Sequence, residues 1–404
     1  MQLLQTLFLA IIPFLLVLGL VVTVHELGHF LAAKALGTKI DRFSIGFGKA
    51  LTSWTDKSGV EWRLGWLPIG GYVRFAGDEN AASIPDAEDL AAMRRDLVSQ
   101  GRAGEIGRYF HFKPIWQRAI IVAAGPFANF ALAITIFAAL LMSFGEMVLP
   151  FRVAGVSPDS AAAAAGFRVG DRVVAVNGRE MTSFNEVQQL IRVRGGVPTS
   201  FVVLRDGQRT ALTATPQWQV QDDPVAGKQR VGVLGLRPAQ SANDYIRIRY
   251  GFFEAVGEGT ARTWDVLRTT VYYLGRMLTG QVSTDQLRGP LGIADVTKNV
   301  TKLGVQGAPD FGAMLMGAGL NLAQLAALIS VSIGFMNLLP VPVLDGGHLM
   351  FYAYEAITRR PLAAKVQAAG YRVGLALVLG LMLFATWNDL QRLRVFNLFG
   401  GLFS

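Results

Sequence analysis

Four long apolar stretches interrupt the polar sequence and decide the fold class of the chain. Three of them carry no charged residue, and each exceeds the roughly 20 apolar residues that a bilayer-spanning helix needs. The fourth is shorter and relies on its flanks, where Lys365 and Arg372 can extend their charged ends toward lipid headgroups. The four stretches are 1–24, 119–145, 311–344 and 373–387. The pattern predicts a polytopic α-helical membrane protein with about four transmembrane helices.

The composition agrees with that prediction and excludes other classes. Only 17% of the 404 residues are charged, whereas soluble domains average about 25%. The chain has no cysteine, which excludes disulfide frameworks and cysteine-based zinc fingers. The net charge of +9 comes from scattered residues without a basic run. That distribution favours loops beside a membrane over nucleic-acid binding.

The first apolar stretch is interpreted as a retained transmembrane helix. The alternative, a cleaved signal peptide, requires a positively charged start, but residues 1–33 contain no Lys or Arg. Basic residues instead follow this stretch, precede the second and lie between the third and fourth. Because short basic loops stay in the cytoplasm, 37–118 and 346–372 are predicted to be cytoplasmic. The N-terminus and 146–310 are then predicted to lie outside.

The outer segment 151–238 has the turn and strand signals of a small α+β domain. The run SPDSAAAAAGFRVGDRVVAVNGREM predicts a short helix, a glycine turn, a strand and an Asn177-Gly178 turn. A hairpin follows, turning at Asp206-Gly207. The pattern A-G-F-x-x-G-D-x-V-x-x-V-N-G resembles PDZ domains, which bind extended peptides at a sheet edge. The alternative is a small β domain with structural duties only.

Two further segments have local signatures, which complete the predicted layout. VEWRLGWLPIGGYVRF, residues 60–75, predicts a β-hairpin or a membrane-skimming β-loop around Gly70-Gly71. Residues 252–278 have the spacing of an amphipathic helix that lies on the outer membrane surface or against the PDZ-like module. The predicted parts are a first transmembrane helix (1–36), a cytoplasmic loop (37–118) with a membrane-associated β-loop (60–75), a second transmembrane helix (119–147), a PDZ domain (151–238), extracytoplasmic amphipathic helices and a linker (239–310), a third transmembrane helix (311–345), a cytoplasmic loop (346–372), and a fourth transmembrane helix with a tail (373–404).

The stretch TVHELGHFLA, residues 23–32, carries the candidate chemistry inside the first apolar segment. Residues four apart share one face of a helix, so His25 and His29 can bind one metal ion. Glu26 lies close enough to contact a water molecule at the metal without being a ligand, and is the candidate general base. The H-E-x-x-H pattern is typical of zinc hydrolases. The alternative is a set of polar groups that only pair with one another, but ionisable groups within a span are costly and usually functional.

A catalytic zinc ion usually has three protein ligands, so a third must come from elsewhere. The stretch NLLPVPVLDGGHLM offers two candidates. Asp345 follows two prolines that interrupt regular helix, and an isolated carboxylate at that depth needs a cation. His348 has a nitrogen that would suit zinc equally well. Asp345 also has a structural alternative, as the N-cap of a helix beginning near Leu349. The residues alone leave this ligand open.

Together these motifs make the chain resemble the site-2 protease family of intramembrane zinc metalloproteases. The resemblance covers nearly the whole chain. Within the family, the chain is similar to the bacterial regulator-of-sigma-E protease type. It has the signature of one PDZ domain, whereas the better-known members of this type have two. Its motifs are HELGH at 25–29, GGYVRF at 70–75, AGPFANF at 124–130, NLLPVPVLDGGHL at 337–349 and TWNDLQRL at 386–393.

The resemblance implies roles for the matching positions. The zinc ligands would be His25, His29 and Asp345. The resemblance therefore favours Asp345 over His348 as the third ligand. Glu26 would be the catalytic acid and base. The substrate-binding residues would be Asn337, Gly71 and Tyr72, the last two in a membrane-entering β-loop that offers its edge to an unwound substrate.

The resemblance also implies a substrate class and a location. Substrates would be single-pass membrane proteins already shortened on the outside, such as anti-sigma factors, cut in regulated intramembrane proteolysis. The protein would lie in the bacterial inner membrane, with its active site near the cytoplasmic side and its PDZ domain in the periplasm. That domain would sense or exclude the outer remnant, or bind a peptide C-terminus.

Two other functions compete with proteolysis. The first is a membrane-anchored PDZ protein without catalysis, which leaves His25, Glu26 and His29 unexplained. The second is a metal transporter, because intramembrane His and Asp also line ion paths. Transporters often have internal repeats, and the sequence has none.

Overall fold

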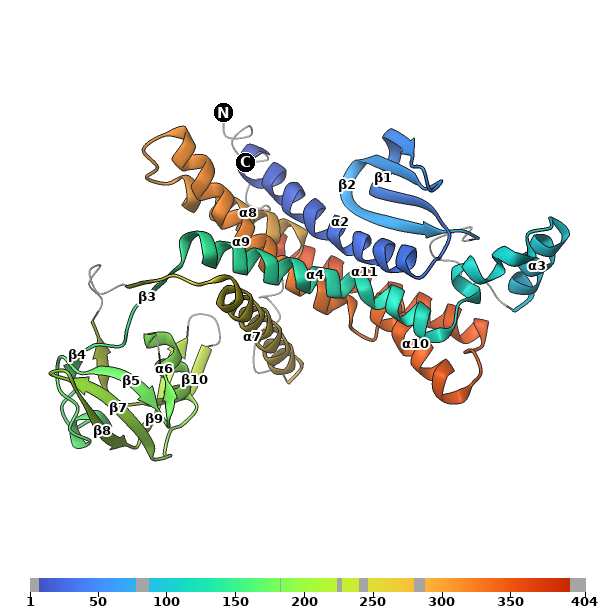
Figure 1. The fold of residues 1–404 in the computed structure, drawn as a ribbon. Helices are drawn as coiled ribbons and strands as arrows, with labels where there is room; N and C mark the ends of the chain where they lie inside the picture. The colour runs from blue at the N-terminus through green and yellow to red at the C-terminus, as the bar shows by residue number, and fades with distance from the viewer. Residues whose placement is uncertain are drawn as a thin grey trace, which may run out of the picture. The chain divides into compact units, whose positions relative to one another are not determined.

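The computed structural model describes residues 7–77, 87–181, 183–223, 227–239, 246–279 and 288–392. The chain forms two compact units. The first comprises residues 1–139 and 255–404 and contains the long apolar helices, and the second comprises 140–254 and contains most of the short strands (Figure 1).

Within the described residues, four helices are long and apolar enough to cross a membrane, which confirms the predicted number. The spans are Leu9–Ala35, Ile115–Phe144, Phe311–Asn337 and Ala364–Gln391. They belong to η1 (Leu7–Ile11) with α2 (Ile12–Ala35), to α4 (Ile115–Phe144), to α9 (Phe311–Asn337) and to α11 (Ala364–Arg392). Large apolar side chains face outward on these helices, as at Leu16 (67% exposed) and Leu383 (70%), where lipid would cover them.

Small residues let these helices approach closely. A Cβ on Gly28 of α2 would lie 2.4 Å from the carbonyl oxygen of Ala124 in α4, so only glycine fits there. Helix α4 also packs against α9 and α7 (Phe252–Leu278) through a small hydrophobic cluster. Its buried members are Ala133, Phe137, Ala327 and Val331, with Val266 and Leu267 of α7 against them.

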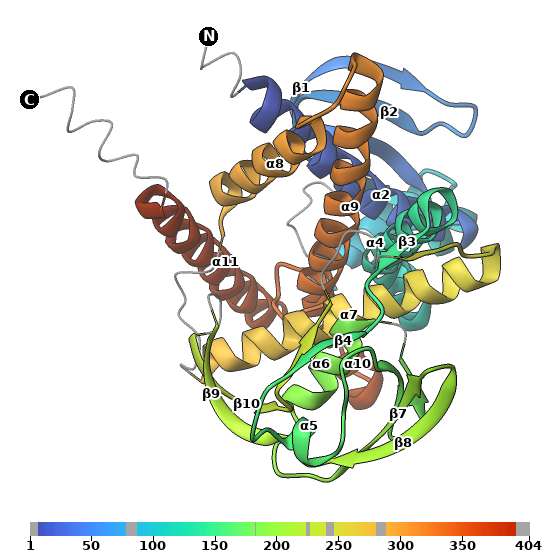
Figure 2. The ribbon, with the colours of Figure 1, turned by 90° about the vertical axis from the view of Figure 1, so that its left-hand side faces the viewer.

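Helix α8 (Pro290–Val305) lies beside the N-terminal half of α9 (Figure 2). The backbones touch where a Cβ on Gly317 would lie 2.0 Å from the carbonyl oxygen of Gly304. At the other end of α8, the N–H of Gly292 donates to the buried carboxylate of Asp389 in α11, at 2.7 Å. An anion is favourable at this position because the first N–H groups of a helix have no partner within it.

Strands β1 (Ile40–Thr55) and β2 (Glu61–Phe75) form a sheet alongside the C-terminal half of α2 (Figure 1). Of the two alternatives predicted for 60–75, the β-hairpin is wrong, because 61–64 and 71–74 do not pair with each other and both pair with 42–45 of β1. The chain instead reverses between the strands, where the Asp56 carboxylate accepts hydrogen bonds from the N–H groups of Ser58 and Val60.

The register of this sheet leaves one run of β2 at an edge. Residues 42–45 of β1 pair both with 61–64 and with 71–74 of β2. Residues 71–75 therefore have β1 on one side, and no other strand of the described chain pairs with them. The sheet packs on α2 and α4 through a buried cluster. Its members are Phe30, Ala33, Ile40, Phe43, Val60, Phe110, Ile121 and Val122.

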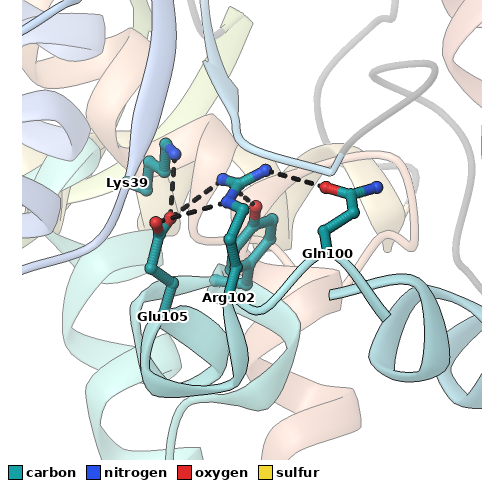
Figure 3. Close-up of polar contacts among 5 residues, drawn as sticks. Lys39, Gln100, Arg102 and Glu105 are labelled. Atoms are coloured by element: carbon teal, nitrogen blue, oxygen red, sulfur yellow. Dashed lines mark hydrogen bonds and ion pairs between the residues drawn. The ribbon is translucent and has the colours of Figure 1, made fainter. Parts of the chain in front are cut away.

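The segment between β2 and α4 contains α3 (Ala87–Ser99), η2 (Ala103–Arg108) and η3 (Phe110–Phe112). Glu105 accepts hydrogen bonds from Arg102 and from Lys39, with Lys39 Nζ at 3.0 Å, and Arg102 also contacts Gln100 (Figure 3). Arg102 and then Lys39 lower the pKa of the Glu105 carboxyl to about 2. Because Lys39 follows α2 directly, this cluster fastens η2 to the end of the first span.

Helix α10 (Asp345–Thr358) begins at Asp345, four residues before the predicted start. Leu344 takes the N-cap position, so the carboxylate of Asp345 does not cap this helix. A Cβ on Gly346 would lie 2.3 Å from the carbonyl oxygens of Leu338 and Leu339, so only glycine allows this turn after α9. Because α9 ends at Asn337, Asp345 lies at the first position of α10 and not within the third span.

The second unit is a small α+β module inserted between α4 and α7 (Figure 2). Its main sheet has the order β6-β5-β7-β8 and is antiparallel. The predicted turns are confirmed, with positive φ at Asn177 and Gly178 between β5 and β6, and at Asp206 and Gly207 between β7 and β8. The elements are β3 (Glu146–Val148), β4 (Val153–Val156), α5 (Ala161–Ala164), β5 (Arg172–Val176), β6 (Arg179–Glu180), α6 (Phe184–Arg192), β7 (Thr199–Arg205), β8 (Gln208–Ala214), β9 (Gln217–Asp223), β10 (Gly227–Val233), β11 (Leu236–Pro238) and β12 (Ile246–Ile248).

The module has its own core and its own buried ion pair. Thirteen buried apolar residues, Phe151, Val153, Ala162, Phe167, Val173, Val176, Met181, Val187, Ile191, Phe201, Val203, Ala214 and Leu234, form one cluster. Arg205 donates two hydrogen bonds of 2.8 Å to the carboxylate of Asp171, which is 1% exposed. An inserted α+β domain was predicted, and the fold class is confirmed.

Candidate metal centre

Helix α2 presents two histidines to the same side. His25 and His29 are separated by about one helical turn, and their Nε2 atoms lie 3.2 Å apart. His25 is buried, although α2 is otherwise a span of apolar side chains. The turn that begins α10 brings the third group, since Oδ2 of Asp345 lies 3.1 Å from Nε2 of His25 and 3.6 Å from Nε2 of His29.

These three atoms fit one zinc ion. Zinc bonds to nitrogen and oxygen are about 2.0–2.2 Å long, so a tetrahedral site separates neighbouring ligand atoms by about 3.3–3.6 Å. The three observed distances run from 3.1 to 3.6 Å. Oδ2 of Asp345 is also buried without a hydrogen bond of normal geometry. Within the described residues, this is the one group of three or more His, Cys, Asp or Glu side chains close enough to hold a metal ion.

Helix α4 supports the two imidazoles from the other side. Nδ1 of His29 lies 2.9 Å from the carbonyl oxygen of Ile121, and Nδ1 of His25 lies 3.2 Å from Nδ2 of Asn129. Between them, a Cβ on Gly125 would lie 2.3 Å from Nε2 of His29. These three residues were not predicted from the sequence. Their spacing of four places them on one helical face, and for Gly125 and Asn129 that signal was available in the AGPFANF motif.

A pocket of about 310 Å³ opens beside the three donor atoms. It collects side chains from α2, β2, α9 and the turn before α10. Its lining residues are Val22, His25, Glu26, His29, Tyr72, Val73, Ile333, Asn337, Val343, Leu344 and Asp345. The pocket therefore contains six of the seven predicted site residues, and the seventh, Gly71, is next to Tyr72.

Glu26 lies between the donor atoms and the edge of β2. Its carboxylate accepts a hydrogen bond from the backbone N–H of Val73. A Cβ on Gly71 would lie 3.0 Å from Cγ of Glu26 and 2.8 Å from the carbonyl oxygen of Ser44. The absence of a side chain at Gly71 thus allows the outer run of β2 to approach the candidate general base.

Tyr72 and Asn337 border the same pocket from different elements. The Tyr72 hydroxyl accepts a hydrogen bond from Arg42 at 3.3 Å, and its ring stacks on Phe47. Burial would raise the pKa of Tyr72, but the hydrogen bond from Arg42 outweighs it and the pKa is lowered. Asn337 is the last residue of α9 and is half-buried.

His348, the alternative third ligand, has another partner. Its Nε2 lies 2.5 Å from the hydroxyl of Tyr371 in α11, so the two share a hydrogen bond. Burial lowers the pKa of His348, which favours the neutral imidazole. The structure brings Asp345, and not His348, into the group with His25 and His29.

Comparison with known proteins gives the family. A family model described as peptidase family M50 matches residues 13–381. The chain belongs to peptidase family M50, the site-2 proteases. The metalloprotease MmpA of Caulobacter vibrioides is 50% identical over 394 residues, which cover 98% of both chains. A protein of Agrobacterium fabrum that is named as a zinc metalloprotease is 42% identical, over 95% of this chain and 96% of its own.

Membership of the M50 family confirms several predictions at once. The chain is a multi-pass membrane protein and a zinc metalloprotease, and zinc is its cofactor. Among solved structures, the PDZ domain of an SdrC-like protein from Listeria innocua aligns with 23% of this chain and 96% of its own, at 15% identity and a TM-score of 0.19.

Proposed function

We propose that His25, His29 and Asp345 hold the zinc ion and that this M50 protease cuts peptide bonds within the transmembrane segments of single-pass membrane proteins. The observation that carries the proposal is the triangle of donor atoms, 3.1–3.6 Å on each side, beside Glu26 and the outer edge of β2. A hydrolytic site and a surface for extended backbone thus occur together next to membrane-spanning helices.

In this proposal Glu26 is the catalytic acid and base. Zinc, when bound by such a donor set, supplies Lewis acidity that makes a water molecule nucleophilic near neutral pH. Glu26 takes a proton from the attacking water and passes it to the nitrogen of the leaving amine. The N–H of Val73 orients the carboxylate for that transfer.

The outer run of β2 is the proposed docking edge for substrate. A peptide bond within a membrane helix is hidden by the hydrogen bonds of that helix, so it must be unwound before it is cut. Residues 71–75 pair with β1 on one side and with no second strand of the described chain. Their free edge offers backbone groups that can replace the lost helical hydrogen bonds of the substrate by strand addition. Gly71 and Tyr72 then contact the substrate backbone, and the Asn337 amide satisfies a group freed at the cut.

The proposed substrates are single-pass proteins, such as anti-sigma factors, after a first cut outside the membrane. The basic residues around the spans support an arrangement in the bacterial inner membrane with 37–118 and 346–372 in the cytoplasm. The module over 151–238 is then a periplasmic PDZ domain that binds or excludes the outer remnant. The loop over 60–75 belongs to the membrane-associated sheet, and α7 lies along the outer face of the spans.

Replacing the proposed base tests the mechanism. Glu26→Gln keeps the size of the side chain, so we expect normal zinc content and a fall of roughly 100- to 10,000-fold in cleavage of a shortened one-span substrate. Glu180→Gln, whose carboxylate is exposed on β6, is the matched control and keeps full activity. Cleavage by the Glu26 variant at the wild-type rate would rule out this role.

The ligand set has its own test. We expect Asp345→Ala to lower zinc content at chelator concentrations that leave the wild type loaded, and His348→Ala to keep its zinc. The reverse result would assign the third ligand to His348.

A further inference from the structure

Asn129 occupies an unusual place beside the proposed zinc ligands. It lies within the apolar span α4, and its side chain is fully buried. The hydroxyl of Ser330 in α9 donates a 2.8 Å hydrogen bond to its backbone oxygen, and a Cβ on Gly334 would lie 3.2 Å from its Cβ. The neighbouring helix therefore fixes the backbone and the Cβ from which this side chain extends.

The two imidazoles have different partners at Nδ1. The partner of His29 is the carbonyl oxygen of Ile121, which can only accept, so the Nδ1 of His29 carries the proton. That tautomer leaves the Nε2 lone pair of His29 free for a metal ion. Nδ1 of His25 needs an acceptor for the same reason, and Asn129 is the group within reach, at 3.2 Å.

Only one orientation of the Asn129 amide is compatible with a ligand role for His25. With Nδ2 toward the imidazole, the ring must accept at Nδ1 and carry its proton on Nε2, where it blocks the metal. Oδ1 is then buried without a hydrogen bond among the described residues, so no partner holds the amide in that orientation. A half-turn of the amide exchanges its two ends, which are nearly equal in size.

We propose that Asn129 is a positioning residue that accepts the Nδ1–H hydrogen bond of His25 through Oδ1 and so directs the Nε2 lone pair to zinc. The inference rests on the proposed ligand set. Metal-bound histidines usually donate their other N–H to an acceptor, and loss of such partners typically lowers metal affinity by roughly 10- to 100-fold. In this chain a backbone carbonyl serves one ligand and a side-chain amide serves the other.

Two substitutions separate acceptance from packing. Asn129→Asp presents only acceptor oxygens, whereas Asn129→Leu has a similar shape and no polar atom. We expect zinc affinity, measured on the full chain by competition with a chelator, to fall roughly 10- to 100-fold in the Leu variant. The Asp variant should stay within a few-fold of the wild type. Equal losses in both, or wild-type affinity in the Leu variant, would overturn the proposal.

A measurement on the unaltered protein removes the dependence on how variants fold. The chain has four histidines, so ¹⁵N labelling of histidine gives few imidazole signals. We expect two zinc-shifted Nε2 signals whose rings both carry a proton on Nδ1. His111→Gln and His348→Asn assign the remaining rings. A zinc-bound ring that is bonded through Nδ1, or that carries its proton on Nε2, would contradict the role of Asn129.

The same measurements distinguish failure of this inference from failure of the ligand set. His25→Ala should lose zinc at chelator concentrations that leave the wild type loaded. If His25→Ala keeps wild-type zinc affinity, the ligand assignment itself is wrong. If His25→Ala loses zinc while Asn129→Leu does not, the ligands stand and only the role of Asn129 falls.

Discussion

Gly125 of α4 leaves the space that His29 of α2 occupies, since a Cβ on Gly125 would lie 2.3 Å from Nε2 of that imidazole and 2.9 Å from Nε2 of His25. The glycine is followed by Pro126, so two successive residues of α4 are unfavourable within a helix. The cost of Gly125 in helix stability is offset by the room that it gives to the proposed ligands.

Gly125→Ala should therefore displace the histidines and weaken zinc binding. Alanine favours the helix by about 1 kcal/mol, so any loss comes from the methyl group among the donor atoms. We expect zinc affinity to fall at least about tenfold, as for other disturbances next to a metal ligand. Zinc content after dialysis against a chelator measures it. Gly380→Ala in α11, where a Cβ would meet nothing within 4 Å, is the control and keeps its zinc. Full zinc content in both variants would show that the imidazoles can move to accommodate the methyl group and still bind zinc.

Gly71→Ala should separate metal binding from catalysis. The added methyl group would lie 3.0 Å from Cγ of Glu26 and 2.8 Å from the carbonyl oxygen of Ser44, so the strand or the glutamate must shift. A shift of about 1 Å in catalytic geometry can slow a reaction by about 100-fold. We expect normal zinc content with cleavage slowed by about 10- to 100-fold. Gly275→Ala in α7, which has open space, is the control. An unchanged cleavage rate would place the substrate away from this edge.

The helical period accounts for what the sequence predicts about the site. Residues four apart share a face, so the H-E-x-x-H spacing alone places His25 and His29 together. Asp345 is 316 residues beyond His29 in number, and only the turn after α9 decides that it, and not His348, reaches the imidazoles. The spacing of Gly125 and Asn129 puts them on one face of α4, but the spacing does not say that this face meets α2.

Strand β1 was not predicted from the sequence, for a local reason. Strand β1 contains Gly46, Gly48 and Lys49, which interrupt the alternation by which a strand is found. Gly70-Gly71 has the composition of a turn, but the pairing of β1 with both ends of β2 keeps it within a strand. Helix α8 lies within 239–310, where amphipathic helices were predicted without bounds.

Arg118 and Glu355 fasten α10, which begins with Asp345, to the start of α4. Their charged groups are 2.8 Å apart and only 15% and 20% exposed, and the guanidinium also lies over the ring of Tyr352. Removing one partner leaves the charge of the other half-buried without its counter-charge. We expect Arg118→Met and Glu355→Gln each to lower the melting temperature and to speed zinc release a few-fold.

The double variant distinguishes a specific pair from general damage at this position. Contacting residues usually show a coupling energy of about 0.5–3 kcal/mol, so Arg118→Met with Glu355→Gln should cost less than the sum of the single changes. Melting curves of the zinc-loaded full chain measure this cycle. Simple additivity would mean that the two side chains act independently and that the ion pair does not hold α10.

Glu105 gives a pH dependence whose sign follows from its lowered pKa. Its carboxyl has a pKa of about 2 in the folded chain, against 4.5 for an ordinary glutamate, because Arg102 and Lys39 favour the charged form. A lowered pKa contributes stability above the unfolded value, and this contribution is lost as the pH falls from about 4.5 toward 2. We expect the wild type to exceed Glu105→Gln in denaturant midpoint at about pH 6, and this advantage to shrink as the pH approaches about 2.5. Arg102→Met removes the largest cause of the lowered pKa and leaves Lys39, so in that background both the advantage and its change with pH should be smaller. An advantage over Glu105→Gln that is the same at both ends of this pH range would show that the cluster in Figure 3 does not act through this carboxylate.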